Sequence, residues 1–126
     1  MQKKKWPSEQ KTELIVSVLE EKKAIDPVVI DVRQRTLMAD KFVIASGMSK
    51  IHIRSLADAI IEKMADNGMK NKRVAGYEDG GWILLDYGDV VIHIMSPEQR
   101  EFYRLEAYWT GAEKGSPPPL SPEEFE

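Results

Sequence analysis

The strongest signal for β-structure in this chain is the segment Trp82-Ile83-Leu84-Leu85-Asp86-Tyr87-Gly88-Asp89-Val90-Val91-Ile92-His93-Ile94-Met95. It consists of two apolar runs rich in β-branched side chains, and only Tyr87-Gly88 separates them. A glycine in so short a loop supplies the positive φ that tight hairpin turns require. The stretch therefore predicts an antiparallel hairpin, with Asp86 paired to Asp89 at its closed end.

This pairing distributes the hairpin's side chains over two faces of a sheet, because successive residues of a strand point to opposite sides. One face carries aliphatic side chains only. The other face, called the mixed face below, combines Trp82, Asp86, Asp89 and His93 with apolar residues, and Trp82 is expected to lie opposite His93. In a sheet with one face in water, polar and apolar residues alternate along each strand. This hairpin has apolar residues on both faces, so both faces must be covered. Either helices of the same domain or another molecule cover the mixed face.

Outside the hairpin, three segments have the spacing of apolar residues that is typical of amphipathic helices. Ser8, Ser49 and Ser96 are each placed to cap one of them, and Ser96 opens a capping box with Pro at the first helical position. Three short apolar runs are expected to be strands. The expected helices are 8–23, 49–67 and 96–109, and the expected strands before the hairpin are 28–32, 42–45 and 73–77.

These elements follow the order α-β-β-α-β-β-β-α, which implies a single-domain α/β fold with a mixed five-stranded sheet and packed helices. The chain has 126 residues, enough for one hydrophobic core. Residues 1–110 are expected to form the domain. The remainder, 111–126, is rich in proline and glutamate, contains Pro117-Pro118-Pro119, and is expected to be a flexible tail.

The composition narrows the classes of function. With 18 Lys and Arg against 21 Asp and Glu, the net charge is -3, the wrong sign for a protein that wraps nucleic acid. No DNA binding is expected, and at most a minor RNA contact through Lys3-Lys4-Lys5. The absence of cysteine excludes disulfides, thiolate zinc ligands and a cysteine nucleophile. No apolar run is long enough to span a membrane and no signal-peptide core follows the lysines, so a cytoplasmic location is expected.

Few residues suggest chemistry. Asp86 and Asp89 could hold a divalent cation, but turn chemistry explains both, because aspartate accepts hydrogen bonds from nearby backbone N–H groups. His52 and His93 are the only histidines, and no serine lies in a nucleophile motif that would partner them. The segment Ser46-Gly47-Met48-Ser49 is at most a weak phosphate cradle. No catalytic residue, metal or cofactor is therefore predicted.

Several segments together resemble the ribosomal silencing factor family, whose members are also called Iojap-related proteins. The carriers of the resemblance are Phe42-Val43-Ile44-Ala45-Ser46-Gly47, Ser49-Lys50-Ile51-His52-Ile53, the hairpin from Trp82 to His93, and Arg100-Glu101-Phe102-Tyr103-Arg104-Leu105-Glu106. They extend over about residues 8–110, and the tail lies outside them. The resemblance implies a nucleotidyltransferase-like α/β fold without transferase activity. The sequence agrees, because it lacks the Gly-Ser and paired-acidic Asp-x-Asp motif of that fold.

The resemblance further implies a function in translation. It implies binding to the large ribosomal subunit, chiefly through its ribosomal protein number fourteen, and a steric block to joining of the small subunit. In cells it implies repression of translation under nutrient limitation and help in large-subunit maturation. The surface that it implies for partner binding consists of Trp82, Leu84, Asp86, Tyr87, His93 and Tyr103.

Two alternatives to this function stay open. A homodimeric scaffold would pair an apolar sheet face of one copy with that of another, and a homodimer is also expected off the ribosome. A nucleotide-binding enzyme of nucleotidyltransferase ancestry would be stabilised by ATP and magnesium, which a thermal melt detects.

Overall fold

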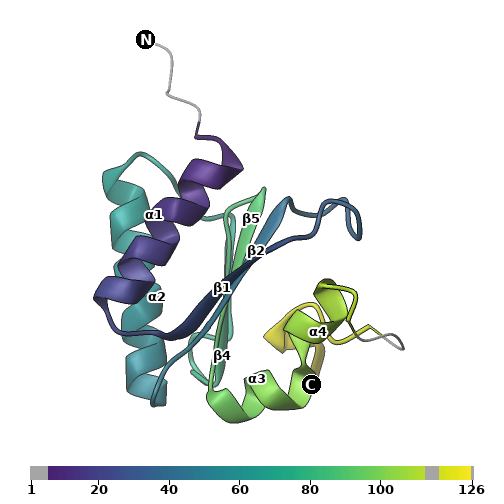
Figure 1. Cartoon of the computed structure of the whole chain (residues 1–126). Coiled ribbons are helices and arrows are strands. Elements are labelled where there is room, and N and C mark those ends of the chain that lie inside the picture. The colour runs from purple at the N-terminus through teal and green to yellow at the C-terminus, as the bar shows by residue number, and fades with distance from the viewer. Residues whose placement is uncertain (1–5, 113–116, 126) are drawn as a thin grey trace.

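The computed structural model describes residues 6–112 and 117–125, and its centre is a mixed five-stranded sheet (Figure 1). The strands lie in the order β1-β2-β5-β4-β3. Strand β2 runs parallel to β5, and the other neighbouring strands are antiparallel. The predicted fold class is confirmed. The strands are β1 (Ile25–Asp31), β2 (Lys41–Ser46), β3 (Arg73–Ala75), β4 (Trp82–Asp86) and β5 (Val90–Met95).

Helices lie on both faces of the sheet, so the chain itself covers much of the mixed face (Figure 1). Helices α1 and α2 bury the aliphatic face, where Ile83 and Ile92 are inaccessible to solvent. On the mixed face, Leu105 and Trp109 of α4 pack against Phe42 and its neighbours. The helices are α1 (Ser8–Glu21), α2 (Lys50–Asp66), α3 (Pro97–Tyr103), α4 (Leu105–Trp109) and the 3-10 helix η1 (Pro122–Phe125).

The prediction of one continuous helix over 96–109 is wrong. Arg104 has φ 51 and ψ 45, a left-handed conformation that ends α3 and begins α4. Helix α3 contains no buried residue, whereas Leu105 and Trp109 of α4 are buried. The turn redirects the chain, and the apolar residues that follow it reach the mixed face.

The predicted hairpin register is also wrong, by two residues. Asp86 pairs with Val91, and the N–H of Tyr87 donates to the carbonyl of Val90 at 2.9 Å. The loop is therefore Gly88-Asp89, with the glycine at φ 87 as its first residue. Because side chains alternate with a period of two, a shift of two residues leaves the paired side chains of β4 and β5 on their predicted faces. Asp89 is the exception: it lies in the loop, and its carboxylate pairs with Lys11 of α1 rather than belonging to the mixed face.

Two of the three predicted helix caps are confirmed. Ser49 Oγ accepts a hydrogen bond from the N–H of His52 at 3.1 Å, and Ser96 Oγ accepts one from Gln99 at 3.2 Å. Ser8 is instead the first helical residue of α1, and Pro7, which has no cap-forming side chain, is its N-cap.

The described end of the chain lies against the sheet. Ser121 is buried, and Glu123 forms an ion pair with Arg73 of β3. The domain boundary at residue 110 stays a prediction, because residues 113–116 lie outside the described part, as do Lys3, Lys4 and Lys5. Among the helices of residues 6–112 and 117–125, none has the length and hydropathy to cross a bilayer.

Candidate functional site

Five of the six residues predicted to bind the partner lie together on the mixed face. Alternation along β4 and pairing with β5 place four of them there, and Tyr103 of α3 joins them through its ring contact with Trp82. The sixth, Tyr87, belongs to the cluster under α1 and α2 on the opposite face, since neighbouring residues of an extended chain point to opposite sides. Burial there raises the pKa of its hydroxyl. The five residues on the mixed face are Trp82, Leu84, Asp86, His93 and Tyr103.

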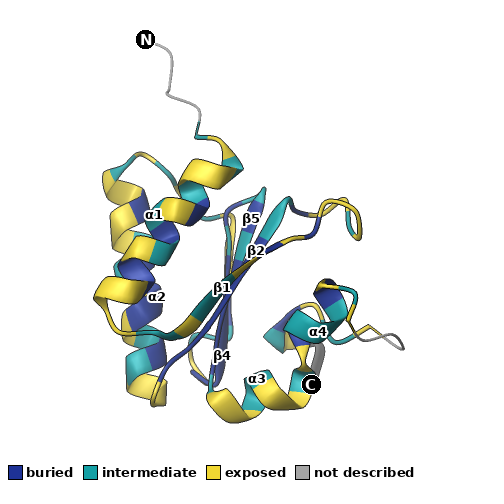
Figure 2. Cartoon of the chain, viewed as in Figure 1, coloured by how far each residue is buried: buried dark blue, intermediate teal, exposed yellow. Residues whose placement is uncertain are grey.

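Most of this group is buried. Trp82 and Leu84 are each 2% exposed and His93 is 1% exposed, whereas Asp86 and Tyr103 are half-buried. The contrast between the buried sheet and the exposed surface of α3 is visible in Figure 2. The surface that this group offers to a partner in the present conformation is therefore that of Asp86 and Tyr103.

An aromatic cluster holds Trp82 in place. The indole Nε1–H of Trp82 donates to Nδ1 of His93 at 3.1 Å, across the diagonal between β4 and β5. The His93 ring meets the edge of Phe42 at a centroid distance of 5.0 Å, and the Trp82 ring lies 5.5 Å from that of Tyr103. The predicted contact between Trp82 and His93 is present, although the shifted register makes it diagonal rather than directly opposite.

The hydrogen bond from Trp82 determines which form of His93 is present. Because Nδ1 accepts, the ring proton of the neutral imidazole is on Nε2, and Nε2 has no hydrogen-bond partner in the described structure. Burial lowers the pKa of His93 from 6.5 to about 3, because the charged ring would lose its hydration. His93 is thus a neutral structural residue at physiological pH.

His93 is expected to make the stability of the fold depend on pH. The unfolded chain protonates His93 as the pH falls through about 6.5, whereas the folded chain does so only near 3, so stability is lost as the pH falls across this window. Between about pH 7.5 and about pH 5, this group should lower the free energy of unfolding by about 2 kcal/mol. Urea unfolding at both pH values measures this change in the free energy of unfolding. A His93→Gln variant, whose amide oxygen can still accept from Trp82, should lose less stability over the same range; an equal loss would contradict the prediction.

A cleft of about 370 Å³ opens on the mixed face beside the aromatic cluster. Phe42, Leu84 and Val91, from the three adjacent strands β2, β4 and β5, form apolar walls, and Arg73 and Asp86 contribute opposite charges. Such an apolar centre with charged residues around it is typical of protein interfaces. Sequence reasoning missed Arg73, because only the pairing of β3 with β4 brings it next to Asp86.

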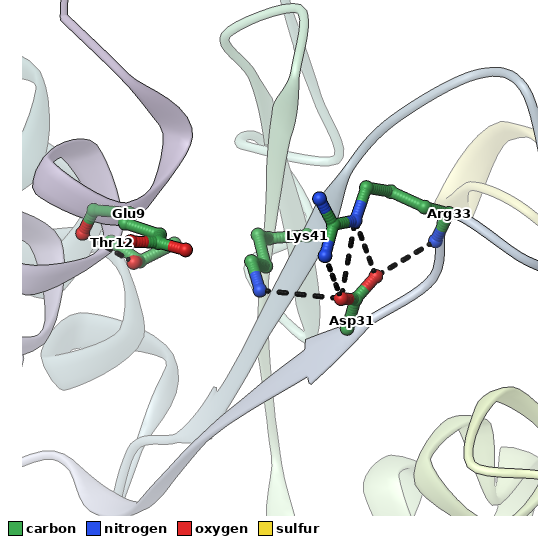
Figure 3. A network of polar contacts seen from close by, with 5 residues as sticks. All are labelled: Glu9, Thr12, Asp31, Arg33 and Lys41. Atoms are coloured by element: carbon green, nitrogen blue, oxygen red, sulfur yellow. Dashed lines mark hydrogen bonds and ion pairs between the residues drawn. The ribbon is translucent and has the colours of Figure 1, made fainter.

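The loop between β1 and β2 contributes a further wall of this cleft. Thr36 and Met38 line the cleft, and Leu37 and Met38 are exposed large apolar side chains. The base of the loop is held by Arg33, whose Nη2 lies 2.6 Å from Oδ2 of Asp31 (Figure 3). The guanidinium holds the pKa of Asp31 well below its usual range. The sequence does not predict that this loop borders the cleft, because two adjacent apolar residues, Leu37 and Met38, show no helix or strand periodicity.

The two aspartates of the hairpin are engaged by the protein itself. Asp86 Oδ1 accepts a hydrogen bond from the N–H of Gly88 at 2.8 Å, the turn interaction that was predicted. Asp89 Oδ1 pairs with Nζ of Lys11 at 2.6 Å. Across the described residues, no group of three His, Cys, Asp or Glu side chains is placed to hold a metal ion.

The segment considered as a phosphate cradle is also engaged internally. The N–H of Gly47 donates to the carbonyl of Met95 at 3.2 Å, and the N–H of Met48 donates to Nδ1 of His52 at 2.9 Å. Nε2 of His52 lies 3.0 Å from the carbonyl of Lys22. His52 therefore joins the C-terminal end of α1 to the N-terminal end of α2, and both N–H groups already donate within the chain.

Residues 5–125 match the family described as ribosomal silencing factor during starvation. A ribosomal silencing factor of Halalkalibacterium halodurans is 34% identical over 100 residues, which cover 79% of this chain and 86% of that protein. The Mus musculus protein named mitochondrial assembly of ribosomal large subunit protein 1 is 33% identical over 101 residues, 78% of this chain and 44% of that protein. A crystal structure of a Chromobacterium violaceum protein superposes with a TM-score of 0.82 at 29% identity, covering 96% of this chain and 100% of that one.

The family match extends further than the resemblance recognised in the sequence. The family match includes the tail up to residue 125, whereas the sequence motifs end near residue 110. Contacts of the tail with the sheet explain why the tail belongs to the family pattern: Ser121 is buried, and Glu123 pairs with Arg73 of β3. The relatives carry the names of silencing and assembly factors, in agreement with the prediction of a protein that is not an enzyme. The fold, the ordered motifs and the match over nearly the whole chain lead to one conclusion: this chain belongs to the ribosomal silencing factor family.

Proposed function

We propose that this protein binds the large ribosomal subunit through its ribosomal protein number fourteen and thereby blocks joining of the small subunit. The family match over residues 5–125 carries the proposal. It is supported by the mouse relative, whose name refers to assembly of a ribosomal large subunit. The block is steric: a folded domain placed where the two subunits must meet raises the free energy of their association without any chemistry. The expected results are lower translation under nutrient limitation, support of large-subunit maturation and action in the cytoplasm.

The partner surface that we propose is the mixed face around the cleft. Asp86 and Tyr103 are accessible members of the predicted set, and Val91, which lines the cleft together with Asp86, is a half-buried apolar residue. A stable interface of standard size buries about 800 Å² per partner, more than these residues provide alone. The net charge of -3 favours encounter with a basic ribosomal protein.

Co-sedimentation with isolated ribosomal subunits tests the proposal. The wild-type protein should bind the large subunit and not the small one, and Asp86→Lys should bind about tenfold more weakly, because it reverses a charge within the interface. Glu62→Lys is the matched control, since Glu62 is exposed on α2 over the opposite face. It should bind like the wild type.

The structural role of Asp86 needs its own control. Asp86→Asn removes the charge but keeps an oxygen that can accept from the N–H of Gly88, so it should melt normally and bind with intermediate strength. Wild-type protein that stays at the top of the gradient with large subunits present would refute the proposed partner. Equal binding by the variants at positions 86 and 62 would refute the proposed surface.

A further inference from the structure

The described end of the chain returns to the sheet and lies across β3 and β4. Ser121 is 5% exposed, and Oε1 of Glu123 accepts a hydrogen bond from Nη1 of Arg73 at 2.6 Å. Pro122 packs so closely on Gly76 that a Cβ built there would lie 2.8 Å from the proline ring. We call residues 117–125 the C-terminal strap.

The strap borders the residues that the proposed partner needs. Leu120 and Ser121 wall the cleft that contains Leu84 and Asp86. Pro122 and Glu123 wall a neighbouring cleft that contains Trp82 and Tyr103. The strap therefore lies beside four of the five predicted partner residues on the mixed face, and two of them, Trp82 and Leu84, are buried in its presence.

The strap is held less firmly than the rest of the cover on the mixed face. The ion pair between Arg73 and Glu123 is solvent-exposed, with 48% and 59% of the two side chains accessible, and Leu120 is 38% exposed. By contrast, Leu105 and Trp109 of α4 belong to the buried core of that face. Exposed ion pairs contribute little to stability, so this pair adds little to the attachment of the strap, which rests mainly on the packing of Ser121 and Pro122.

We propose that the C-terminal strap is an internal competitor for the partner surface, and that the ribosomal protein displaces it on binding. The inference rests on the proposed function and adds a regulation of the same site. The partner first meets the open part of the cleft at Asp86 and Val91, and the surfaces of Leu84 and Trp82 that the strap covers become accessible as it leaves. The observed dissociation constant is then the intrinsic one divided by the fraction of molecules in which the strap is displaced. Strengthening or weakening the strap should change affinity without any change in the partner surface itself.

A charge reversal weakens the strap in the full chain. Glu123→Arg breaks the ion pair with Arg73 and should tighten binding to large subunits by about two- to fivefold, the range expected from loss of an exposed ion pair. Glu62→Arg makes the same change in net charge on the exposed surface of α2 and should not tighten binding. Equal affinities of these two variants would contradict the proposal.

A reversible cross-link gives the decisive test. The chain contains no cysteine, so Arg73→Cys and Glu123→Cys provide a unique pair of thiols that a cleavable bifunctional reagent joins. The locked protein should bind large subunits at least about tenfold more weakly than the same protein after cleavage, because the displaced fraction falls towards zero. If locked and cleaved protein bind alike while the wild type binds, the strap proposal is overturned and the proposed function stands. If the wild type itself does not bind, both are overturned.

Discussion

Replacing Trp82 with alanine is expected to lower the free energy of unfolding by about 4 kcal/mol, the largest effect anticipated for a single side chain here. Trp82 is 2% exposed and contacts both His93 and Tyr103. Its removal leaves a cavity between the sheet and α3. It also removes the one donor that satisfies Nδ1 of His93, so the imidazole is left buried with neither nitrogen paired in the described structure.

Urea unfolding followed by circular dichroism measures this effect. Trp82→Phe keeps most of the apolar volume but loses the N–H donor, and it should destabilise by about 1–2 kcal/mol. Phe102→Ala is the control, because Phe102 is an aromatic residue of α3 that is 76% exposed, and its effect should stay within about 0.5 kcal/mol. A loss at Trp82 as small as that at Phe102 would show that the aromatic cluster does not support the fold.

Because Trp82 supports the fold, Trp82→Ala is a poor probe of the partner surface. Aromatic residues are frequent hot spots of protein interfaces, so the sequence favours Trp82 as the anchor of the partner surface, and loss of binding by Trp82→Ala would then indicate a lost interface contact. In the folded chain the same substitution removes core packing, so weaker binding would also follow from partial unfolding. Asp86 is the better probe, since it is half-buried and its conservative amide variant keeps the turn.

Replacing Arg100 with alanine is expected to lower the free energy of unfolding by about 3 kcal/mol, because it removes one partner from a largely buried set of charge-assisted hydrogen bonds. The Arg100 side chain is 13% exposed. Its Nε donates to the carboxylate of Glu106, Nη1 donates to the carbonyl of Ile25 at 3.1 Å and to Oγ of Ser46 at 3.2 Å, and Nη2 donates to the carbonyl of Asp26 at 2.7 Å. One guanidinium thus joins α3, α4, β1 and β2.

Replacing Arg100 with lysine distinguishes the contribution of the positive charge from that of the planar guanidinium geometry. Arg100→Lys keeps the positive charge but cannot reproduce the planar fork, so it should recover less than half of the lost stability. Glu101→Ala, at an exposed neighbouring position of α3, should change stability by less than about 0.5 kcal/mol. Urea unfolding of the three variants beside the wild type measures the series. A lysine variant as stable as the wild type would contradict the role assigned to the fork, because charge alone would then hold these elements together.

The sequence predicted those features that depend on residues close together in the chain. The capping serines Ser49 and Ser96 act on backbone N–H groups three residues away, and such contacts can be recognised from spacing alone. The same holds for the two faces of the hairpin, because the alternation of side chains needs no knowledge of what covers them. The grouping of Trp82, Leu84, Asp86 and His93 on one face followed from this alternation.

Other features depend on contacts that no local pattern contains. The hairpin closes at Gly88-Asp89 because Asp89 is held from elsewhere: its carbonyl accepts the N–H groups of Asp40 and Lys41, and its carboxylate pairs with Lys11. The left-handed turn at Arg104 is likewise accompanied by the contacts of Arg100 with β1 and β2.

Periodicity and capping in the sequence by themselves determined the fold class, the two-faced hairpin and the residues of the mixed face. Tertiary structure alone decided which of those residues are accessible. Trp82 and Leu84 are buried because α4, Tyr103 and the C-terminal strap lie over them, and Tyr87 is buried under α2 on the other side. The physical reason is that burial depends on distant segments meeting in space, and an apolar residue has the same sequence pattern whether its own chain or a partner covers it.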